Sequence, residues 1–291
     1  MGSLFIGDFS IVRPEFESNQ EHTLEWLIRA HIASEEKKKG KEWSSVEREA
    51  FQRKIREDFL RVGCKPDKIA KRGHSTSDYL HFDWKKMEIY PLDDAPDGVS
   101  LGNRSKAFER ISDKVLEDLY IDASTPPANL IHVTCTGYLA PSSAQKLVSK
   151  KRWGNETYVT HAYHMGCHGA VSALKIGRGF TGRTDIVHTE ICSLQTNPGE
   201  HGLDQMVAQS LFSDGYIKYS LLEKPTAGSL KLLSLHETII PKSINAMTWN
   251  IAEWGFAISL AKEIPVHIVR ALKEYLKVLA SKGNTTVENL L

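Results

Sequence analysis

The feature that most limits the possible folds of this chain is a regular alternation of short apolar strands and short helices between residues 129 and 222. The expected strands are residues 130–134, 157–163, 184–192 and 216–222, and the expected helices are residues 142–151, 167–178 and 203–212. Such alternation is typical of crossover units on a mostly parallel or mixed sheet that helices cover on both faces. The predicted fold class is therefore α/β.

The residues before this region have a helical pattern. Apolar residues recur at helical spacing in three segments, residues 24–32, 46–62 and 108–119. The charged run 34–41 is expected to be a loop or the end of a helix. Ser44 and Glu47 form a capping-box pattern at the start of the second segment, and Gly63 is its expected stop. The first third of the chain is accordingly predicted to be helical.

The segment after residue 225 looks like the beginning of a second unit. An expected strand at 230–237, an aromatic-rich stretch at 247–260 and an expected helix at 266–279 follow a linker-like pause. We therefore predict two parts, residues 1–225 and residues 226–291. The second part is expected to be the start of a C-terminal half whose further layers would follow Leu291 and whose absence would leave apolar faces exposed.

Composition excludes several classes of partner. The 37 Lys and Arg residues balance 36 Asp and Glu residues, for a net charge of +1, so no long-range field favours nucleic acid. No uninterrupted apolar stretch approaches 18 residues, which argues against a membrane span. The N-terminal segment lacks the pattern of a signal peptide, and four scattered cysteines suit a reducing compartment. We expect a cytoplasmic protein.

Two motifs could indicate a cofactor or a metal. Residues 177–182 match G-x-G-x-x-G, but a helix precedes them and a strand follows, the reverse of the order that binds a pyrophosphate. They are interpreted as a helix cap and a turn. Zinc ligation by the His and Cys residues of 161–168 with His188 and Cys192 has no matching spacing template. No metal site is predicted.

The same stretch offers a nucleophilic cysteine. A strand at 158–163 and a tight turn at 164–166 would place Cys167 first in the following helix. The positive end of the helix dipole would favour the thiolate and lower the pKa of Cys167. Gly166 would let a substrate carbonyl approach backbone N–H groups. Cys167 could equally be a small core residue, and the spacing alone leaves both interpretations open.

Four segments in order carry a resemblance to a known family: residues 131–142 (IHVTCTGYLAPS), 163–168 (YHMGCH), 188–192 (HTEIC) and 209–215 (QSLFSDG). They resemble type III polyketide synthases, the chalcone synthase-like branch of the thiolase superfamily, and most closely the bacterial members. The resemblance implies a layered αβαβα fold, a homodimer, and no metal or redox cofactor. Coenzyme A thioesters would be the substrates.

The resemblance implies roles for individual residues. Cys167 takes the position of the nucleophile, which would accept an acyl group from acyl-CoA and condense it with malonyl-CoA-derived units to a pyrone, resorcinol or chalcone-like polyketide. Cys135 occupies a small polar position of the cavity lining. Gln195 replaces a bulky aromatic gatekeeper, and Ala140 replaces a larger residue that reaches across the dimer. Both replacements imply a roomier tunnel and a longer or fatty acyl starter.

The resemblance is looser elsewhere. Lys68, Lys71 and Arg72 lie in a stretch similar to the coenzyme A phosphate contacts, although a solvated helix face is an alternative interpretation. The His-Pro-Gly-Gly turn that polarises the thioester in this family does not occur in residues 1–291. It is expected beyond Leu291, as is the catalytic Gly-Asn turn that follows it in the family. The chain could therefore be a C-terminally truncated pseudoenzyme or a subunit of a split synthase that needs a complementing C-terminal chain. A β-ketoacyl synthase III-like condensing enzyme is a further alternative.

Overall fold

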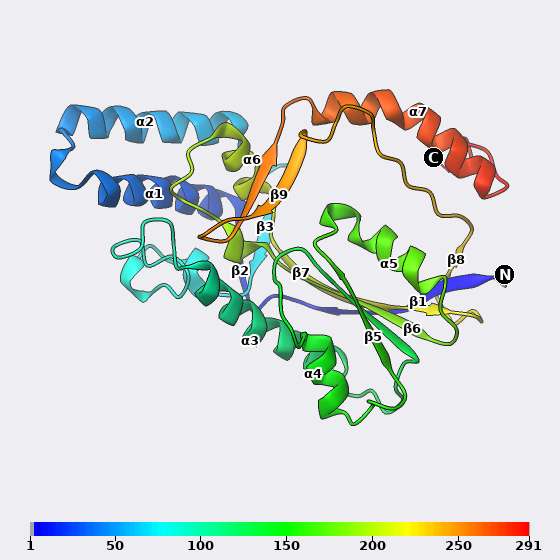
Figure 1. The fold of residues 1–291 in the computed structure, drawn as a ribbon. Coiled ribbons are helices and arrows are strands. Elements are labelled where there is room, and N and C mark those ends of the chain that lie inside the picture. The colour runs from blue at the N-terminus through cyan, green and yellow to red at the C-terminus, as the bar shows by residue number, and fades with distance from the viewer. Residues whose placement is uncertain (1–2, 291) are drawn as a thin grey trace.

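The structure, a computed structural model, describes residues 3–290 as a mixed six-stranded sheet with helices on both faces (Figure 1). The strands are β1 (Leu4–Val12), β2 (Phe16–Asn19), β3 (Lys71–His74), β4 (Asn129–Thr134), β5 (Tyr158–Tyr163), β6 (Thr184–Ile191), β7 (Asp214–Leu222), β8 (Leu230–Leu232), β9 (Met247–Ile251) and β10 (Phe256–Leu260). The α-helices are α1 (Gln20–Lys39), α2 (Ser45–Val62), α3 (Leu101–Leu119), α4 (Ser143–Lys150), α5 (Gly169–Gly177), α6 (Leu203–Leu211) and α7 (Ile264–Lys282). The predicted α/β class is confirmed.

The main sheet has the strand order β5-β4-β6-β7-β1-β8. β4 runs parallel to both β5 and β6, whereas β7 is antiparallel to β6 and to β1. All six residues of β4 are buried, as expected for a central parallel strand covered on both faces. The carboxyl ends of β5, β4 and β6 therefore meet at one edge of the sheet.

Alternate side chains of the strands pack in two separate hydrophobic cores. On β6, Ile186 packs in the cluster that contains Ala173 of α5, whereas Val187 packs in the larger cluster with Phe108 of α3. This alternation follows from the two-residue period of a strand. Helices α3 and α4 thus cover one face of the sheet and α5 covers the other, as Figure 1 shows.

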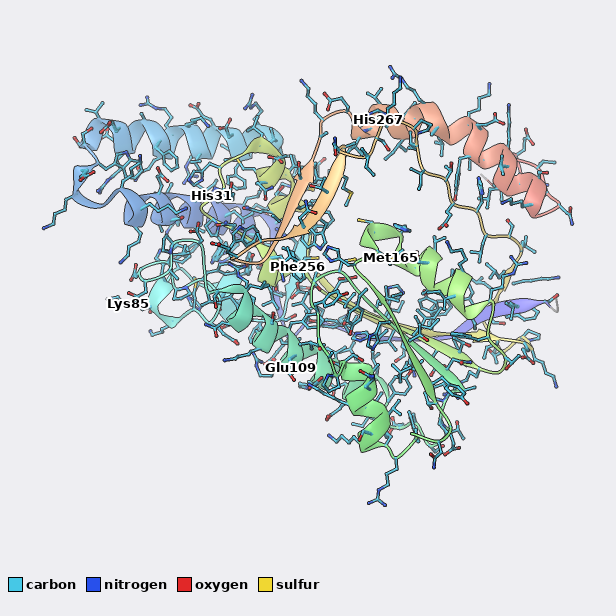
Figure 2. The ribbon with its side chains drawn as sticks, viewed as in Figure 1. His31, Lys85, Glu109, Met165, Phe256 and His267 are labelled. Carbon is cyan, nitrogen blue, oxygen red and sulfur yellow. The ribbon has the colours of Figure 1, made fainter. Side chains whose placement is uncertain are left out.

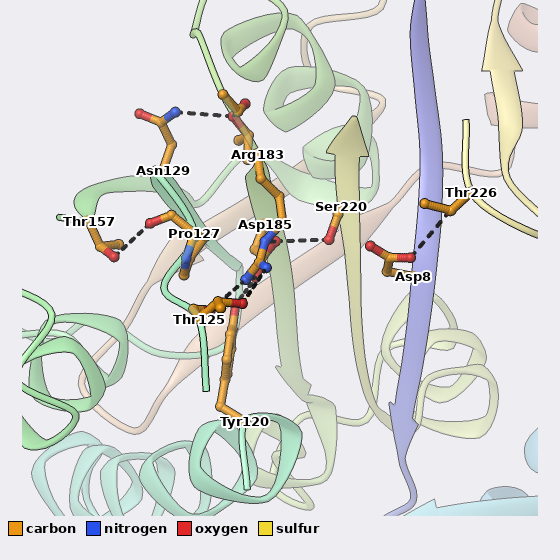
Figure 3. Close-up of polar contacts among 12 residues, drawn as sticks. Asp8, Tyr120, Thr125, Pro127, Asn129, Thr157, Arg183, Asp185, Ser220 and Thr226 are labelled. Atoms are coloured by element: carbon orange, nitrogen blue, oxygen red, sulfur yellow. Dashed lines mark hydrogen bonds and ion pairs between the residues drawn. The ribbon is translucent and has the colours of Figure 1, made fainter. Parts of the chain in front are cut away.

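A polar network ties the end of α3 to the sheet (Figure 3). The buried carboxylate of Asp185 on β6 accepts hydrogen bonds from the Tyr120 hydroxyl at 2.9 Å and from the Ser220 hydroxyl at 2.8 Å. Arg183 donates to the same carboxylate at 3.0 Å from Nε. Because a buried carboxylate is costly without such partners, the network fixes β6 and β7 relative to α3.

The first third of the chain is only partly as predicted. The capping box is confirmed, since Ser44 and Glu47 exchange hydrogen bonds at the start of α2, and Gly63 follows the last helical residue. The prediction of a wholly helical segment was wrong. β1, β2 and β3 lie there, and β1 is stabilised by pairing with β7 and β8, which are more than 200 residues away in sequence. Local patterns cannot reveal such pairing.

The segment after β7 differs in detail from the prediction. The strand expected at 230–237 is only β8, three residues long, which pairs with β1 in the main sheet. The aromatic-rich stretch forms an antiparallel hairpin of β9 and β10. The predicted helix at 266–279 is present as α7. No helix within residues 3–290 combines the length and the apolar character that a membrane span requires.

Helix α7 lies at the periphery with an exposed apolar face (Figure 1). Ala280 is its only buried residue, while Val266, Ile268, Val269 and Leu272 are between 45% and 71% exposed. Contiguous exposed apolar residues of this kind usually mark a surface that another polypeptide covers. The exposed apolar faces expected from the sequence are present on this helix.

We expect the chain on its own to self-associate or precipitate through α7. Replacing Val269 and Leu272 by glutamate should shift the protein towards monomer in light scattering coupled to size-exclusion chromatography, because charges oppose association of an apolar face. The melting temperature should change little, since both side chains are exposed. Lys273→Glu, which alters charge beside this face without removing an apolar group, is the matched control. A monodisperse monomeric wild-type chain would contradict the prediction.

Candidate active site

Three of the four cysteines gather where three neighbouring parallel strands end. Cys135 directly follows β4, Cys167 lies four residues after β5, and Cys192 directly follows β6. All three line one cavity of about 340 Å³ with a mostly apolar wall. Ligand sites of α/β proteins are commonly found at the carboxyl ends of the strands, and this volume is within the usual range. The sheet topology thus explains why residues far apart in sequence share one cavity.

A sharp turn positions Cys167. His164 and Gly166 both have positive φ, 57° and 65°, and the His164 N–H donates to the Thr134 carbonyl oxygen at 2.8 Å. Glycine adopts this backbone region without steric cost, which explains Gly166. Cys167 lies in a 3-10 turn, Gly166–His168, that leads into α5. The helix expected to begin at Cys167 therefore begins two residues later, at Gly169.

The electrostatics of Cys167 differ from the expectation of a thiol activated by a helix. Cys167 is an exposed residue, but partial loss of solvent at its thiol and the nearby Glu190 carboxylate raise its pKa. The prediction that the helix N-terminus lowers this pKa was wrong, because loss of solvent and a like charge outweigh the dipole here. Across residues 3–290, no side chain forms a hydrogen bond with the Cys167 thiol. The resting group is therefore the neutral thiol.

Glu190 is the carboxylate of the cavity. It accepts hydrogen bonds from the Cys135 backbone N–H at 2.9 Å and from the Thr136 hydroxyl at 3.1 Å. Burial raises the pKa of Glu190 to about 7, although these hydrogen bonds act in the opposite direction. Burial, followed by the charge of Glu190, raises the pKa of Cys135 to about 12. Sequence reasoning gave Glu190 no role, and the signal it missed is a carboxylate on a buried strand.

The pKa of Glu190 predicts how stability depends on pH. The group titrates at 4.5 when unfolded and at about 7 when folded, so the folded chain holds this proton more tightly. Stability from this group is therefore present at low pH and is lost as pH rises from about 4.5 towards 7. Glu190→Gln removes the titration, so between pH 5 and pH 8.5 the variant should gain on the order of 3 kcal/mol relative to wild type.

Urea unfolding at the two pH values measures this difference. Glu156→Gln, at an exposed position, is the matched control and should follow the wild-type pH dependence. Other buried carboxyl groups titrate in both proteins, so the comparison between variant and wild type isolates Glu190. An identical pH dependence of Glu190→Gln and wild type would show that Glu190 ionises normally.

The hairpin of β9 and β10 closes over the cysteines. The Trp249 indole N–H donates to the Cys135 carbonyl oxygen at 2.6 Å, and the Trp249 carbonyl oxygen lies 2.7 Å from Nε2 of His164. Figure 2 labels Met165, on the turn between β5 and α5, and Phe256 on the hairpin. The ring centroids of His164 and Phe256 lie 5.6 Å apart. Sequence reasoning identified this stretch only as aromatic-rich. The hairpin holds the loops after β4 and β5 together.

Gln195 connects the hairpin to the sheet. The side chain is buried, donates to the Thr136 carbonyl oxygen at 2.9 Å and accepts from the Phe256 backbone N–H at 2.9 Å. It lines the cavity together with Cys135. Ala140 is exposed and is not part of the lining formed by the described residues. The structure thus brings Cys135, Cys167 and Gln195 together and leaves Ala140 apart.

The three residues considered for coenzyme A contacts do not lie together. Lys68 and Lys71 are exposed and pair with the carboxylates of Asp67 and Glu17. Arg72, the next residue of β3, is 5% exposed and lines the cavity. Successive residues of a strand point to opposite faces, which explains the separation. Lys68 and Lys71 remain accessible to a phosphate, whereas Arg72 belongs to the interior.

The histidines of the candidate zinc cluster have separate partners. Nε2 of His161 bonds with the Ser142 hydroxyl at 2.8 Å, and Nε2 of His188 bonds with the Tyr219 hydroxyl at 3.0 Å. Among the residues that the structure describes, no three His, Cys, Asp or Glu side chains are grouped so that they could hold a metal ion. In the glycine motif, α5 ends at Gly177 and β6 begins at Thr184, so the order is helix, turn, strand.

Comparison with known proteins gives polyketide synthases among the sequence relatives. The chain is 23% identical over 244 residues to 1,3,6,8-tetrahydroxynaphthalene synthase of Streptomyces coelicolor, which covers 76% of this chain and 64% of that protein. It is 28% identical over 163 residues to "Probable polyketide synthase 1" of Dictyostelium discoideum, which covers 53% of this chain and 5% of that protein. The chain thus spans less than two thirds of either relative. No protein-family model matches it.

Solved structures show the same fold. The C-terminal type III polyketide synthase domain of Steely1 from Dictyostelium superposes with a TM-score of 0.74 at 19% identity, covering 97% of this chain and 74% of that one. PKS-I of the brown alga Ectocarpus siliculosus gives 0.78 at 16% identity, with coverage of 98% and 74%. The Streptomyces coelicolor tetrahydroxynaphthalene synthase, a bacterial type III polyketide synthase, gives 0.72 at 20% identity, with coverage of 96% and 73%. The thiolase-like fold is confirmed, as is the resemblance to type III polyketide synthases.

Proposed function

We propose that this chain, whose relatives and structural neighbours are type III polyketide synthases, is an acyltransferase that takes an acyl group from a coenzyme A thioester onto Cys167. The observation that carries the proposal is the position of Cys167. It lies at the end of a parallel strand, on a sharp turn, and lines a mostly apolar cavity large enough for an acyl chain. A core cysteine would not need such a turn.

The transfer exchanges one thioester for another. Sγ of Cys167 attacks the thioester carbonyl carbon, the bond from that carbon to the coenzyme A sulfur breaks, and the thiol proton of Cys167 ends on the departing thiolate. The apolar wall removes the acyl chain from water. A covalently held chain then lies beside any second substrate, so a later condensation becomes intramolecular.

The comparisons support polyketide synthesis in general terms. The extension unit, the product, the coenzyme A contacts and the dimer are part of the proposal. Malonyl-CoA would supply the extension units, and the product would be a pyrone, a resorcinol or a chalcone-like polyketide. The exposed Lys68 and Lys71 would contact coenzyme A phosphates. A homodimer would form through β5, the edge strand of the sheet, where Tyr158 is 78% exposed.

Intact-mass spectrometry after incubation with an acyl-CoA tests the proposal. The mass of the wild-type chain should rise by one acyl group, and hydroxylamine should remove the increment, as it does for a thioester. An unchanged mass across short and long acyl-CoAs would refute acyl transfer to this chain.

A second candidate function is favoured by one observation of the cavity. The lining contributed by residues 3–290 contains no Asn, and its one His, His188, is engaged with Tyr219. A subunit of a split synthase, or a binding protein without its own condensing activity, would have such a lining. Purification of a tagged chain from its native cells distinguishes the two functions, because a split synthase would bring a second polypeptide in equal amount. A β-ketoacyl synthase III-like activity would instead use an acyl carrier protein as extender donor.

A further inference from the structure

The cavity contains a buried positive charge that acyl transfer to Cys167 does not require. Arg72 of β3 lines the cavity and is 5% exposed. Cys135, Cys167 and Cys192 line the same cavity. The Arg72 side chain and the three cysteines therefore share one cavity.

The hydrogen bonds of Arg72 leave three of its five N–H donors unused. Nη2 donates to the backbone carbonyl oxygens of Gln209, at 2.8 Å, and Phe212. Nε and Nη1 are buried and have no hydrogen-bond partner within residues 3–290. In that part of the chain no carboxylate forms an ion pair with Arg72.

Asp214, whose charge acts on Arg72, already has hydrogen-bond donors of its own. Asp214 accepts hydrogen bonds from the backbone N–H of Ser193 at 2.8 Å and from its hydroxyl at 2.7 Å, as well as from the Ser75 hydroxyl. The hydrogen bonds of Arg72 are therefore to backbone carbonyl oxygens. A buried guanidinium with three unsatisfied N–H donors is costly, and most such groups in proteins have a partner.

A ligand oxygen would supply the missing partner. The planar guanidinium presents its N–H groups in a fork that matches the two oxygens of a carboxylate, and the resulting bonds are charge-assisted. A methyl group would satisfy none of these donors. Tyr79, Thr196 and Ser213 add polar groups to the same lining.

We propose that Arg72 binds a carboxylate at the far end of the acyl group that Cys167 carries, so that this chain selects acyl thioesters derived from dicarboxylic acids. The inference rests on the proposed acyl transfer to Cys167. It differs from the long methyl-ended starter that Gln195 and Ala140 suggested from the sequence. The size of the cavity would limit the length of the acyl chain, while Arg72 would select the functional group at its far end.

Competition between matched thioesters tests the selection. The chain is given equal amounts of glutaryl-CoA and pentanoyl-CoA, which have the same number of acyl carbons, and the two adducts are compared by intact mass. Two further pairs of coenzyme A thioesters extend the test to shorter and longer acyl chains: succinyl against butanoyl, and adipyl against hexanoyl. The carboxylate-ended adduct should exceed the methyl-ended one about tenfold for at least one length, the size expected of one charge-assisted hydrogen bond.

Variants then assign the preference to Arg72. Arg72→Met should lower the adduct ratio about tenfold, and Arg72→Lys should retain part of it. Lys231→Met, which removes an exposed charge on β8 outside the cavity, should leave the ratio unchanged. If Arg72→Met does not fold, the wild-type ratio and the lysine variant decide. A wild-type ratio of one or less at every length, or a ratio unaffected in Arg72→Met, overturns the inference.

Binding to Cys167→Ala separates this inference from the proposed acyl transfer. Isothermal titration of that variant with glutaramate and with pentanamide requires no thioester chemistry, because an amide stands in for the thioester end in both and only glutaramate carries a carboxylate. Tighter binding of glutaramate that Arg72→Met abolishes supports the carboxylate site even if wild-type Cys167 is never acylated. Equal binding of the two amides overturns the site even if Cys167 is acylated normally.

Discussion

Replacing Cys167 by alanine is expected to abolish covalent acyl loading, with a fall of at least about a thousandfold in the rate of adduct formation, as for other nucleophile deletions. The reason is chemical, because alanine has no group that can form a thioester. Alanine also matches the size of cysteine closely, so the turn after β5 and the packing of α5 on β4 should persist. Intact mass after incubation with acyl-CoA is the measurement.

The control for this prediction is a cysteine outside the cavity. Cys64 is half-buried and does not line the cavity, so Cys64→Ala should be loaded at the wild-type rate. Cys135→Ala is informative for a different reason, since Cys135 shares the cavity with Cys167. Its thiol has a pKa of about 12, which makes it a poor nucleophile at neutral pH. A full adduct on Cys167→Ala that disappears in Cys135→Ala would reassign the acyl carrier.

The strands and helices between residues 129 and 222 were predictable because their signals are local. Apolar runs such as that of β4 and the Ser142 cap of α4 depend on neighbouring residues, and their ends fall within a few residues of the expected positions. β1 was not predictable in the same way. The register of β1 is fixed by hydrogen bonds to β7 and β8. The nine residues of β1 themselves do not indicate which strands they will pair with.

In the candidate site too, local features were predictable from the sequence, whereas contacts between distant residues were not. A strand, a turn and a helix that are adjacent in sequence made Cys167 a candidate, and the family resemblance then favoured the nucleophile over a core residue. The role of Trp249 was missed, because its bond to the Cys135 carbonyl oxygen joins residues 114 positions apart. The interior position of Arg72 depends on which face of β3 meets α6. The lysines next to Arg72 in the sequence suggested a solvent-exposed segment instead. The raised pKa of Cys167 likewise arises from Glu190, on another strand.

The chain alone is expected to stop at the loaded state when malonyl-CoA is added. Decarboxylative condensation develops negative charge on a thioester oxygen, and each preorganised donor aimed at such an oxygen is worth about 10²–10³ in rate. Within the described lining there is no Asn, and burial lowers the pKa of His188, the one His, to about 4 while Tyr219 occupies its Nε2. Lacking two donors, the chain should condense at least about 10⁴-fold more slowly than a complete site.

Successive intact-mass spectra of the acyl-loaded chain measure this directly. Each extension would add one two-carbon keto unit to the Cys167 adduct, whereas the expected spectrum keeps the starter mass unchanged over many hours. Cys167→Ala with malonyl-CoA is the control for non-enzymatic adducts. Keto-unit increments that appear on the wild-type chain and vanish in Cys167→Ala would contradict the prediction. They would show that donors of this chain other than a His and an Asn suffice to stabilise the oxyanion.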